Sequence, residues 1–198
     1  SEIYDLAQSS VAISKMISSE KITKIASSLL NCNKSNLSHY QNMIRMDTPY
    51  NKKNKSAWHQ EVQFFYNPGI VFCAPLIKMF QKIGYLNILE KSHLLGEIEY
   101  QRNKPSSYAT SRLSTSEIPK KTLSSYLKRF KLVRAKLQLG DAVFFGSNLL
   151  HSSSDNVSNF TRFSCQTRFF NTLGNNFAPF RPKIFLNPYS CKRLNRKF

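Results

Sequence analysis

The chain has 198 residues, of which 41% are hydrophobic and 20% charged, a composition typical of a globular protein rather than a disordered one. This length fits one domain with a sizeable core. Lysine and arginine number 29 against 11 acidic residues, which gives a formal net charge of +18. Such a charge favours anionic partners (nucleic acid, acidic membrane or charged metabolites) and predicts no fold. The sequence contains no apolar run long enough for a transmembrane helix.

The expected compartment follows from the start of the chain and from the cysteines. The first thirty residues lack the basic start and apolar block of a signal peptide. Cys32, Cys73, Cys165 and Cys191 form neither a CxxC pair nor a dense framework, which also argues against a four-cysteine zinc site. We therefore expect buried, reduced cysteines and a cytoplasmic protein. Two disulfides in a secreted protein are the alternative.

Residues 1–36 are predicted to be a helical support for the rest of the domain. Apolar residues recur at helical spacing between residues 22 and 30, and Ser18 or Ser19 is placed to cap the start of that helix.

From residue 37 onward the pattern changes to short aromatic and β-branched segments between turn-forming stretches, which predicts a sandwich or barrel over residues 37–175. A basic helical insert is expected near residues 117–136, with seven Lys or Arg and a single acid. This charge run is either a solvated helix face or an anion-binding surface. Residues 176–198 are predicted to be a basic surface tail. The expected strands are 42–46, 57–65, 70–75, 86–89, 142–150 and 160–170.

Two segments carry residues suited to metal chemistry. If residues 57–65 form a strand, His59 and Glu61 point to the same face and offer two ligands of an iron-type facial triad. A chance pairing on a strand is the alternative explanation. Farther along, a strand is predicted to end near His151, followed by a polar turn and a returning strand.

Alternation along the returning strand places Arg162, Ser164, Gln166 and Arg168 on one face. An arginine 11 residues after His151 is positioned to reach a ligand held by the metal of that histidine. Its planar guanidinium suits a carboxylate, which it binds bidentately. The alternative is that Arg162 is a salt-bridge partner at a barrel edge and His151 an ordinary histidine at the end of a loop.

Four stretches of the sequence, taken together, resemble the phytanoyl-CoA dioxygenase family of iron(II)/2-oxoglutarate oxygenases. The first three are residues 44–49 (IRMDTP), 58–61 (WHQE) and 84–96 (GYLNILEKSHLLG). The fourth reads GD-x-V-x-F-x(3)-LLHSSS-x-N-x-S-x(3)-R, and its histidine follows His59 by 92 residues. They occur in the order found in the family, whose usual forms include WHQD and PGSHK. The resemblance implies a mainly β fold with flanking helices, a double-stranded β-helix (jelly roll, cupin-like) with helices on one outer face.

The resemblance also implies roles for single residues. His59, Glu61 and His151 match the metal ligands, with Glu61 standing where the family usually has aspartate. Arg162 matches the arginine that pairs with the distal carboxylate of 2-oxoglutarate, and Ser153 matches a serine that assists it. His93 matches a loop histidine that is not a ligand.

The implied activity is that of an Fe(II)/2-oxoglutarate-dependent dioxygenase. It would use Fe(II), 2-oxoglutarate and O2 to hydroxylate a C–H bond of a small metabolite, releasing CO2 and succinate. Glu61 argues against a halogenating variant, which would lack the carboxylate ligand. Two alternatives stay open: a non-enzymatic basic β-barrel that binds nucleic acid, and a degenerate, metal-less relative of the oxygenases.

The substrate is predicted to be a small and anionic molecule, since a basic cavity mouth would concentrate anions. Evenly spread surface charge is the alternative. Specificity is expected to reside in the 47–57 and 91–116 stretches. Steering requires that several of the following ring the cavity: Arg45, Lys52, Lys53, Lys55, Lys91, Arg102, Lys104 and Arg112.

Overall fold

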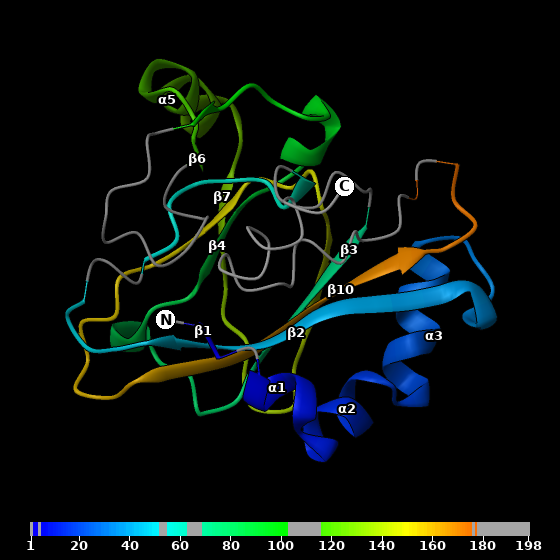
Figure 1. Cartoon of the computed structure of the whole chain (residues 1–198). Helices are drawn as coiled ribbons and strands as arrows, with labels where there is room; N and C mark the ends of the chain where they lie inside the picture. The colour runs from blue at the N-terminus through cyan, green and yellow to red at the C-terminus, as the bar shows by residue number, and fades with distance from the viewer. Residues whose placement is uncertain are drawn as a thin grey trace, which may run out of the picture.

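The computed structural model describes residues 2–3, 5–51, 55–62, 69–102, 116–175 and 177. Strands dominate this part of the chain, and helices lie mainly at its start (Figure 1). The helices are α1 (Asp5–Ser9), α2 (Val11–Ile17), α3 (Glu20–Leu29) and α5 (Lys120–Arg129), with 3-10 turns η1 (Lys34–Asn36), η3 (Gln81–Ile83) and η4 (Ser92–Leu95). The strands are β1 (Glu2–Ile3), β2 (Leu37–Asp47), β3 (Ile70–Pro75), β4 (Leu86–Leu89), β5 (Gln101–Arg102), β6 (Ser116–Glu117), β7 (Leu132–Ala135), β8 (Val143–Gly146), β9 (His151–Ser153) and β10 (Arg162–Asn171).

Two antiparallel sheets face each other and form the predicted jelly roll. The larger sheet has the strand order β1-β2-β10-β3-β8, and the smaller one β7-β4-β9; β5 and β6 pair separately. Val71, Cys73 and Phe145 of the larger sheet pack against Leu86 and Ile88 of the smaller. The space between the two sheets is therefore part core and part cavity.

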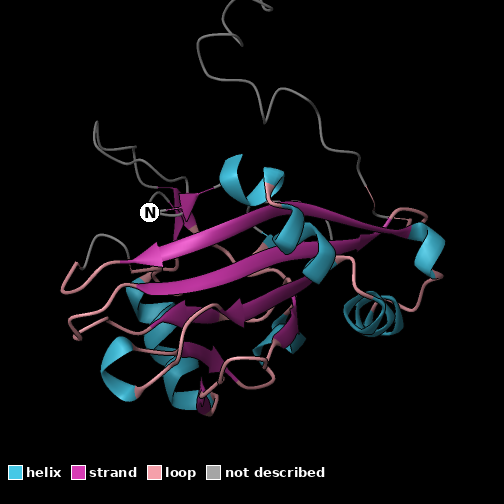
Figure 2. Ribbon diagram, turned by 90° about the horizontal axis from the view of Figure 1, so that it is seen from below, coloured by secondary structure: helices cyan, strands magenta, loops and turns pink. Residues whose placement is uncertain are grey.

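The N-terminal helices cover the outer face of the larger sheet, as expected from the sequence (Figures 1 and 2). Ile13 and Ile17 of α2 lie in one apolar cluster with Phe72 of β3 and with Cys165 and Phe169 of β10. Odd-numbered residues of β10 thus face the helices. Because β10 is buried on both faces, the strand that carries Arg162 and Arg168 is held in place. Ser10 caps α2 through its hydroxyl, whereas Ser19 stands at the start of α3 without a side-chain cap bond.

The predicted helix over 117–136 is wrong in its second half. Helix α5 ends at Arg129, Phe130 is extended, and Leu132–Ala135 form β7, which pairs with β4. Pairing with β4 takes up residues 132–135, and the Glu90 N–H donates to the Lys131 carbonyl at 2.9 Å just before this pairing begins. The α5 helix packs through Leu123 and Tyr126, with Phe130 following it in the same cluster, while Leu127 is exposed.

Two strand predictions also need correction. Residues 57–62 are not a strand: His59 makes an isolated bridge with His151, and Glu61 lies in a turn. Residues 63–65 of that prediction lie outside the described part. The 142–150 segment divides into β8 and a turn, so that His151 begins β9 rather than ending a strand. The strands predicted at 70–75 and 86–89 are confirmed as β3 and β4.

The structure describes only some of the residues in the predictions about the cysteines and the C-terminal tail. Cys73 and Cys165 are buried free thiols, and burial raises the pKa of Cys73 to about 11 and that of Cys165 to about 12. Cys32 is half-buried, and Cys191 lies outside the described residues. Apart from Phe177, the predicted basic tail also lies outside them. No helix in the described ranges has the length and apolar character of a membrane span.

Candidate metal centre

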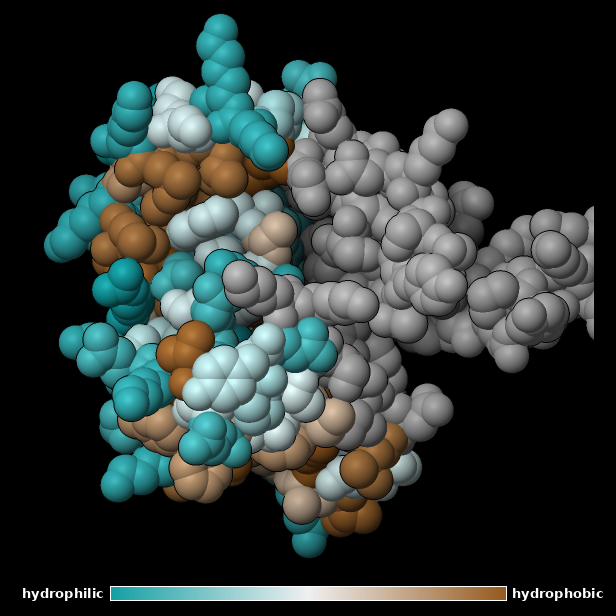
Figure 3. Space-filling view, turned by 90° about the vertical axis from the view of Figure 1, so that its left-hand side faces the viewer, coloured by the Kyte–Doolittle hydropathy of each residue, from teal (hydrophilic) through white to brown (hydrophobic). Residues whose placement is uncertain are grey.

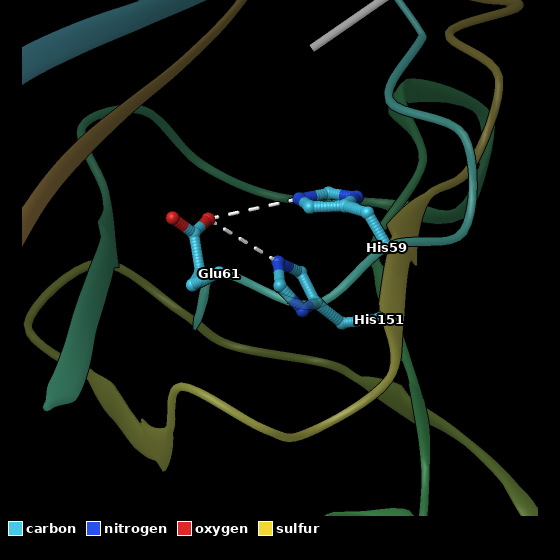
Figure 4. A group of neighbouring side chains, drawn as sticks. All are labelled: His59, Glu61 and His151. Atoms are coloured by element: carbon cyan, nitrogen blue, oxygen red, sulfur yellow. Dashed lines mark ion pairs between the residues drawn. The ribbon is translucent and has the colours of Figure 1, made fainter. Parts of the chain in front are cut away.

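Three buried side chains converge at one end of the cavity between the sheets (Figure 4). Oε1 of Glu61 lies 3.6 Å from Nε2 of His59 and 3.6 Å from Nε2 of His151. The donor atoms of the three residues all lie within 4.8 Å of one another. Two backbone hydrogen bonds between His59 and His151, of 3.0 and 3.1 Å, hold the two histidines side by side. The sequence predicted this group, although a bridge and a turn assemble it rather than one strand.

Backbone carbonyls set the orientation of both imidazoles. Nδ1 of His59 lies 2.7 Å from the carbonyl of Ala57, and Nδ1 of His151 lies 2.9 Å from that of Leu149. A ring nitrogen this close to a carbonyl donates its proton, which leaves the lone pair on Nε2. Burial, and then the neighbouring His59, lower the pKa of His151. His151 is thus neutral at neutral pH, as a metal ligand must be.

Glu61 is ionised although it is buried. Burial alone would raise the pKa of this carboxyl, but Arg168, followed by His151 and His59, holds it well below its usual range. Metal bonds to nitrogen and oxygen of about 2.0–2.2 Å place neighbouring ligand atoms about 3 Å apart. The observed 3.6 Å separations need only a small closure. Two imidazoles and one carboxylate in this arrangement therefore fit an iron-type facial triad.

The glutamine between the first two ligands fastens the turn to its surroundings. Gln60 is fully buried, and its Nε2 donates to the carbonyls of Gly96 (2.8 Å) and Asn148 (2.6 Å). Its Oε1 accepts a hydrogen bond of 3.0 Å from the backbone of Ile98. Gln60 therefore links the segment after η4 and the turn before β9 to the metal group. No role was predicted for Gln60 from the WHQE stretch.

A buried charge cluster occupies another part of the cavity lining. Arg162 directs Nε (3.0 Å) and Nη2 (2.8 Å) at Oδ2 of Asp47. Arg45 bonds the same carboxylate at 2.9–3.2 Å and reaches the Ser56 hydroxyl at 2.6 Å. Burial would raise the pKa of Asp47, but Arg45 and then Arg162 outweigh it and lower that pKa. Arg162 thus lines the cavity as predicted, and it is also a salt-bridge partner, as the alternative had it, although Asp47 was not predicted as the partner.

The backbone beside Arg162 leaves no room for a side chain. Gly84 has φ of +84° and ψ of 164°, a conformation that is essentially restricted to glycine. A Cβ at this position would lie 2.7 Å from Nη1 of Arg162 and 2.6 Å from the carbonyl of Asp155. Nη1 of Arg162 in turn donates to the carbonyl of Ile83 at 3.2 Å. The glycine turn before β4 therefore helps to orient the arginine.

The metal group and the arginine cluster line a single cavity that has both polar and apolar side chains. Ser153 also lines it, and its hydroxyl accepts a hydrogen bond of 2.8 Å from the backbone of Ser56. The polar lining confirms the alternation predicted for β10, since all four residues predicted to share a face line the cavity. The polar lining includes Arg45, Asp47, Arg162, Ser164, Gln166 and Arg168. The apolar lining consists of Met43, Pro75, Met79, Leu86, Ala135 and Leu137.

The basic residues predicted to ring the cavity mouth have mixed outcomes. Arg45 lines the cavity but is bound to Asp47, and Lys55 forms an exposed ion pair of 3.2 Å with Asp155. Lys91 is exposed and is not among the lining residues. The other predicted positions, Lys52, Lys53, Lys104, Arg112 and the side chain of Arg102, lie outside the described part.

Comparison with known proteins agrees with this geometry. The family model for phytanoyl-CoA dioxygenase (PhyH) matches residues 3–164. The chain belongs to the phytanoyl-CoA dioxygenase family. No curated protein sequence matches it. The family prediction made from WHQE and the LLHSSS segment is therefore confirmed.

Solved structures share the fold of this family member at low sequence identity. EvdO2 from Micromonospora carbonacea var. aurantiaca, complexed with 2-oxoglutarate, has a TM-score of 0.68 at 16% identity, over 94% of this chain and 73% of its own. EctD from S. alaskensis, with 2-oxoglutarate and 5-hydroxyectoine, has a TM-score of 0.67 at 14% identity, over 85% and 55%. The epimerase SnoN, in complex with Fe3+, alpha ketoglutarate and nogalamycin RO, has a TM-score of 0.65 at 16% identity, over 91% and 72%. The double-stranded β-helix prediction is confirmed.

Proposed function

We propose that this protein uses Fe(II), 2-oxoglutarate and O2 to hydroxylate a C–H bond of a small molecule. Family membership and the metal-type donor group support iron/2-oxoglutarate oxygenase chemistry. The observation that carries the proposal is the geometry of that group: Oε1 of Glu61 lies 3.6 Å from Nε2 of each histidine, and all three side chains are buried. Hydroxylation is a more specific claim than iron/2-oxoglutarate chemistry, because the epimerase SnoN has a similar fold.

His59, Glu61 and His151 would hold the iron in this proposal. When bound, iron and 2-oxoglutarate supply the oxidising chemistry, which consumes O2 and releases CO2 and succinate. The protein itself contributes orientation and exclusion of water, because all three ligands are almost fully buried. The carbonyls of Ala57 and Leu149 keep both Nε2 atoms directed at the metal position.

Arg162, with Arg45 beside it, is the proposed anchor for the distal carboxylate of 2-oxoglutarate. Two guanidinium groups share the single carboxylate of Asp47, which leaves one positive charge in the cluster. A second carboxylate from the cosubstrate would balance it. The Ser153 hydroxyl accepts its hydrogen bond from Ser56, so its own proton is available for the same carboxylate.

The charges of the described lining also limit the proposed substrate. The three arginines and two carboxylates of the lining have a net charge of +1. Bound Fe(II) would add two positive charges and 2-oxoglutarate two negative ones, so the net charge of the loaded cavity would again be +1. The loaded cavity therefore favours a substrate with at most one anionic group, and Met79, Leu86 and Leu137 favour an aliphatic body.

We expect kcat/KM for such a substrate to fall as salt rises from low to high ionic strength. A flat profile would exclude electrostatic attraction of an anionic substrate.

The proposed activity has a direct test that needs no knowledge of the substrate. The anaerobically purified protein, supplied with Fe(II), 2-oxoglutarate and O2, should release succinate slowly, and faster when a metabolite mixture contains the substrate. A chelator should stop this release, and fresh Fe(II) should restore it. Succinate release that persists in the chelator, or none at any metabolite concentration with iron demonstrably bound, would contradict the proposal.

The alternatives from the sequence analysis receive less support. Hydrophilic side chains project from many places on the face in Figure 3 and form no single groove there. A metal-less relative would have no reason to bring three buried donor side chains within 4.8 Å of one another. A reducing, cytoplasmic setting is part of our proposal, supported by the free thiols of Cys73 and Cys165 and by the need to keep iron as Fe(II).

A further inference from the structure

The metal-type carboxylate has a buried arginine partner that neither the sequence nor the family comparison assigns. Arg168 is 3% exposed and lies on β10. Its Nη2 lies 3.0 Å from both oxygens of Glu61, and its Nε lies 3.2 Å from Oε2. We propose that Arg168 is a positioning residue that makes Glu61 bind the metal through Oε1 alone. This inference rests on the proposed function.

The two oxygens of Glu61 have different surroundings. Oε1 faces both histidines, 3.6 Å from each Nε2. Oε2 receives both Nε and Nη2 of Arg168, whereas Oε1 receives Nη2 alone, at 3.0 Å. Two charge-assisted hydrogen bonds would have to break before Oε2 turned toward the metal. Coordination through one oxygen keeps three positions of a six-coordinate ion open, and coordination through both would fill one of them.

The strand that carries Arg168 is held on both sides, which makes the arginine a fixed reference point. Arg168 pairs with Tyr40 of β2 and with Val71 of β3. A register shift between Gln166 and Arg168 in the pairing with β2 marks a local irregularity just before it. Because the backbone is fixed in the middle of the sheet, the guanidinium can set the carboxylate rather than follow it.

The length of Glu61 matches this arrangement. The family usually has aspartate here, which is one methylene shorter. A C–C bond is about 1.5 Å long, so an aspartate carboxylate on the same backbone would retreat by about that distance. Bonds of 3.0–3.2 Å to Arg168 would then exceed hydrogen-bonding range. Glu61 and Arg168 therefore act as a matched pair.

The test measures Co(II) affinity by competition with a chelator, and then 2-oxoglutarate affinity of the Fe(II)-loaded protein under anaerobic conditions. We expect Arg168→Met to weaken metal binding by about 10–100-fold, the usual effect of removing a hydrogen-bonding partner of a ligand. Arg168→Lys, which keeps the positive charge but not the two-pronged guanidinium, should have a metal affinity between those of the wild type and Arg168→Met. Glu61→Asp should also weaken binding, and the double variant E61D/R168M should be no weaker than E61D alone. Arg134→Met, the same change at an exposed position of β7, is the control.

The loaded variants provide a second readout that a purely structural role would not change. At saturating Fe(II), Arg168→Met should bind 2-oxoglutarate at least about tenfold more weakly than wild type, because Glu61 is then free to occupy a further position. Folding is checked by thermal unfolding of each variant; if Arg168→Met does not fold, the Arg168→Lys and Glu61→Asp comparison decides. Unchanged affinities in the arginine variants, or an E61D variant that binds metal as well as wild type, would overturn the inference. A wild-type protein that binds no metal would instead refute the proposed function.

Discussion

Glu61→Ala is expected to abolish metal binding and 2-oxoglutarate turnover. The substitution removes the only carboxylate of the three-residue donor group, and two imidazoles alone are a weak site for Fe(II). It also leaves the buried guanidinium of Arg168 without its anion, which should lower the free energy of unfolding by about 3–5 kcal/mol. Chelator competition with Co(II) measures the first effect, and denaturant unfolding measures the second.

The double variant E61A/R168M separates these two effects. Removing both charges should recover much of the lost stability, because no buried charge is left unpaired, but it should not restore metal binding. Glu90→Ala is the matched control, since Glu90 is half-exposed and its ion pair with Lys131 is long at 3.9 Å. Metal affinity of the wild-type order in a folded E61A protein would contradict the proposed ligand set.

The residues of the donor group were predicted better than the backbone that carries them. His59, Glu61 and His151 were identified from residue type, spacing and family resemblance, and they converge in the structure. The reason given for the first pair, a shared strand face, was wrong. A turn after the bridge between His59 and His151 brings Glu61 to the histidines, and this depends on Gln60 and its distant carbonyl partners.

The alternation of β10 was predictable because the strand lies between two environments of opposite polarity. Arg162 and Arg168 face the cavity, and Cys165 and Phe169 face the helices, as period-two alternation requires. The partners of the arginines were not predictable in the same way. Asp47 is 115 residues from Arg162 in the sequence, and only the pairing of β2 with β10 places the two opposite each other.

The end of α5 shows the opposite case, in which a local pattern was overridden by a distant one. The 117–136 stretch contains helix-compatible residues throughout, and its basic character gives no sign of a break. The strand β4 offers a free edge to residues 132–135, which form β7 on it. Tertiary pairing of this kind decides such boundaries, and no local rule contains it.

The second large effect is expected at Arg162. Arg162→Ala should weaken 2-oxoglutarate binding by the Fe(II)-loaded protein by about 10–100-fold, since a hydrogen bond to a charged group contributes about 1.5–3 kcal/mol. Co(II) affinity should not change, because Arg162 contacts Asp47 and two backbone carbonyls rather than a metal ligand. Anaerobic titration of the loaded protein with 2-oxoglutarate gives the comparison. Lys131→Ala, at an exposed ion pair, is the control.

Asp47→Asn should change the same affinity in the opposite direction. Asp47 competes with the cosubstrate for the Arg162 fork, so its neutralisation should tighten 2-oxoglutarate binding. The variant should also be less stable without cosubstrate, because Arg45 and Arg162 then lose their shared anion. Saturating 2-oxoglutarate should therefore raise its Tm by more than it raises that of the wild type. If Arg162 served only as the partner of Asp47, both variants would lose stability and neither would change cosubstrate affinity. Opposite shifts in the two variants are thus the specific signature of a carboxylate anchor at Arg162.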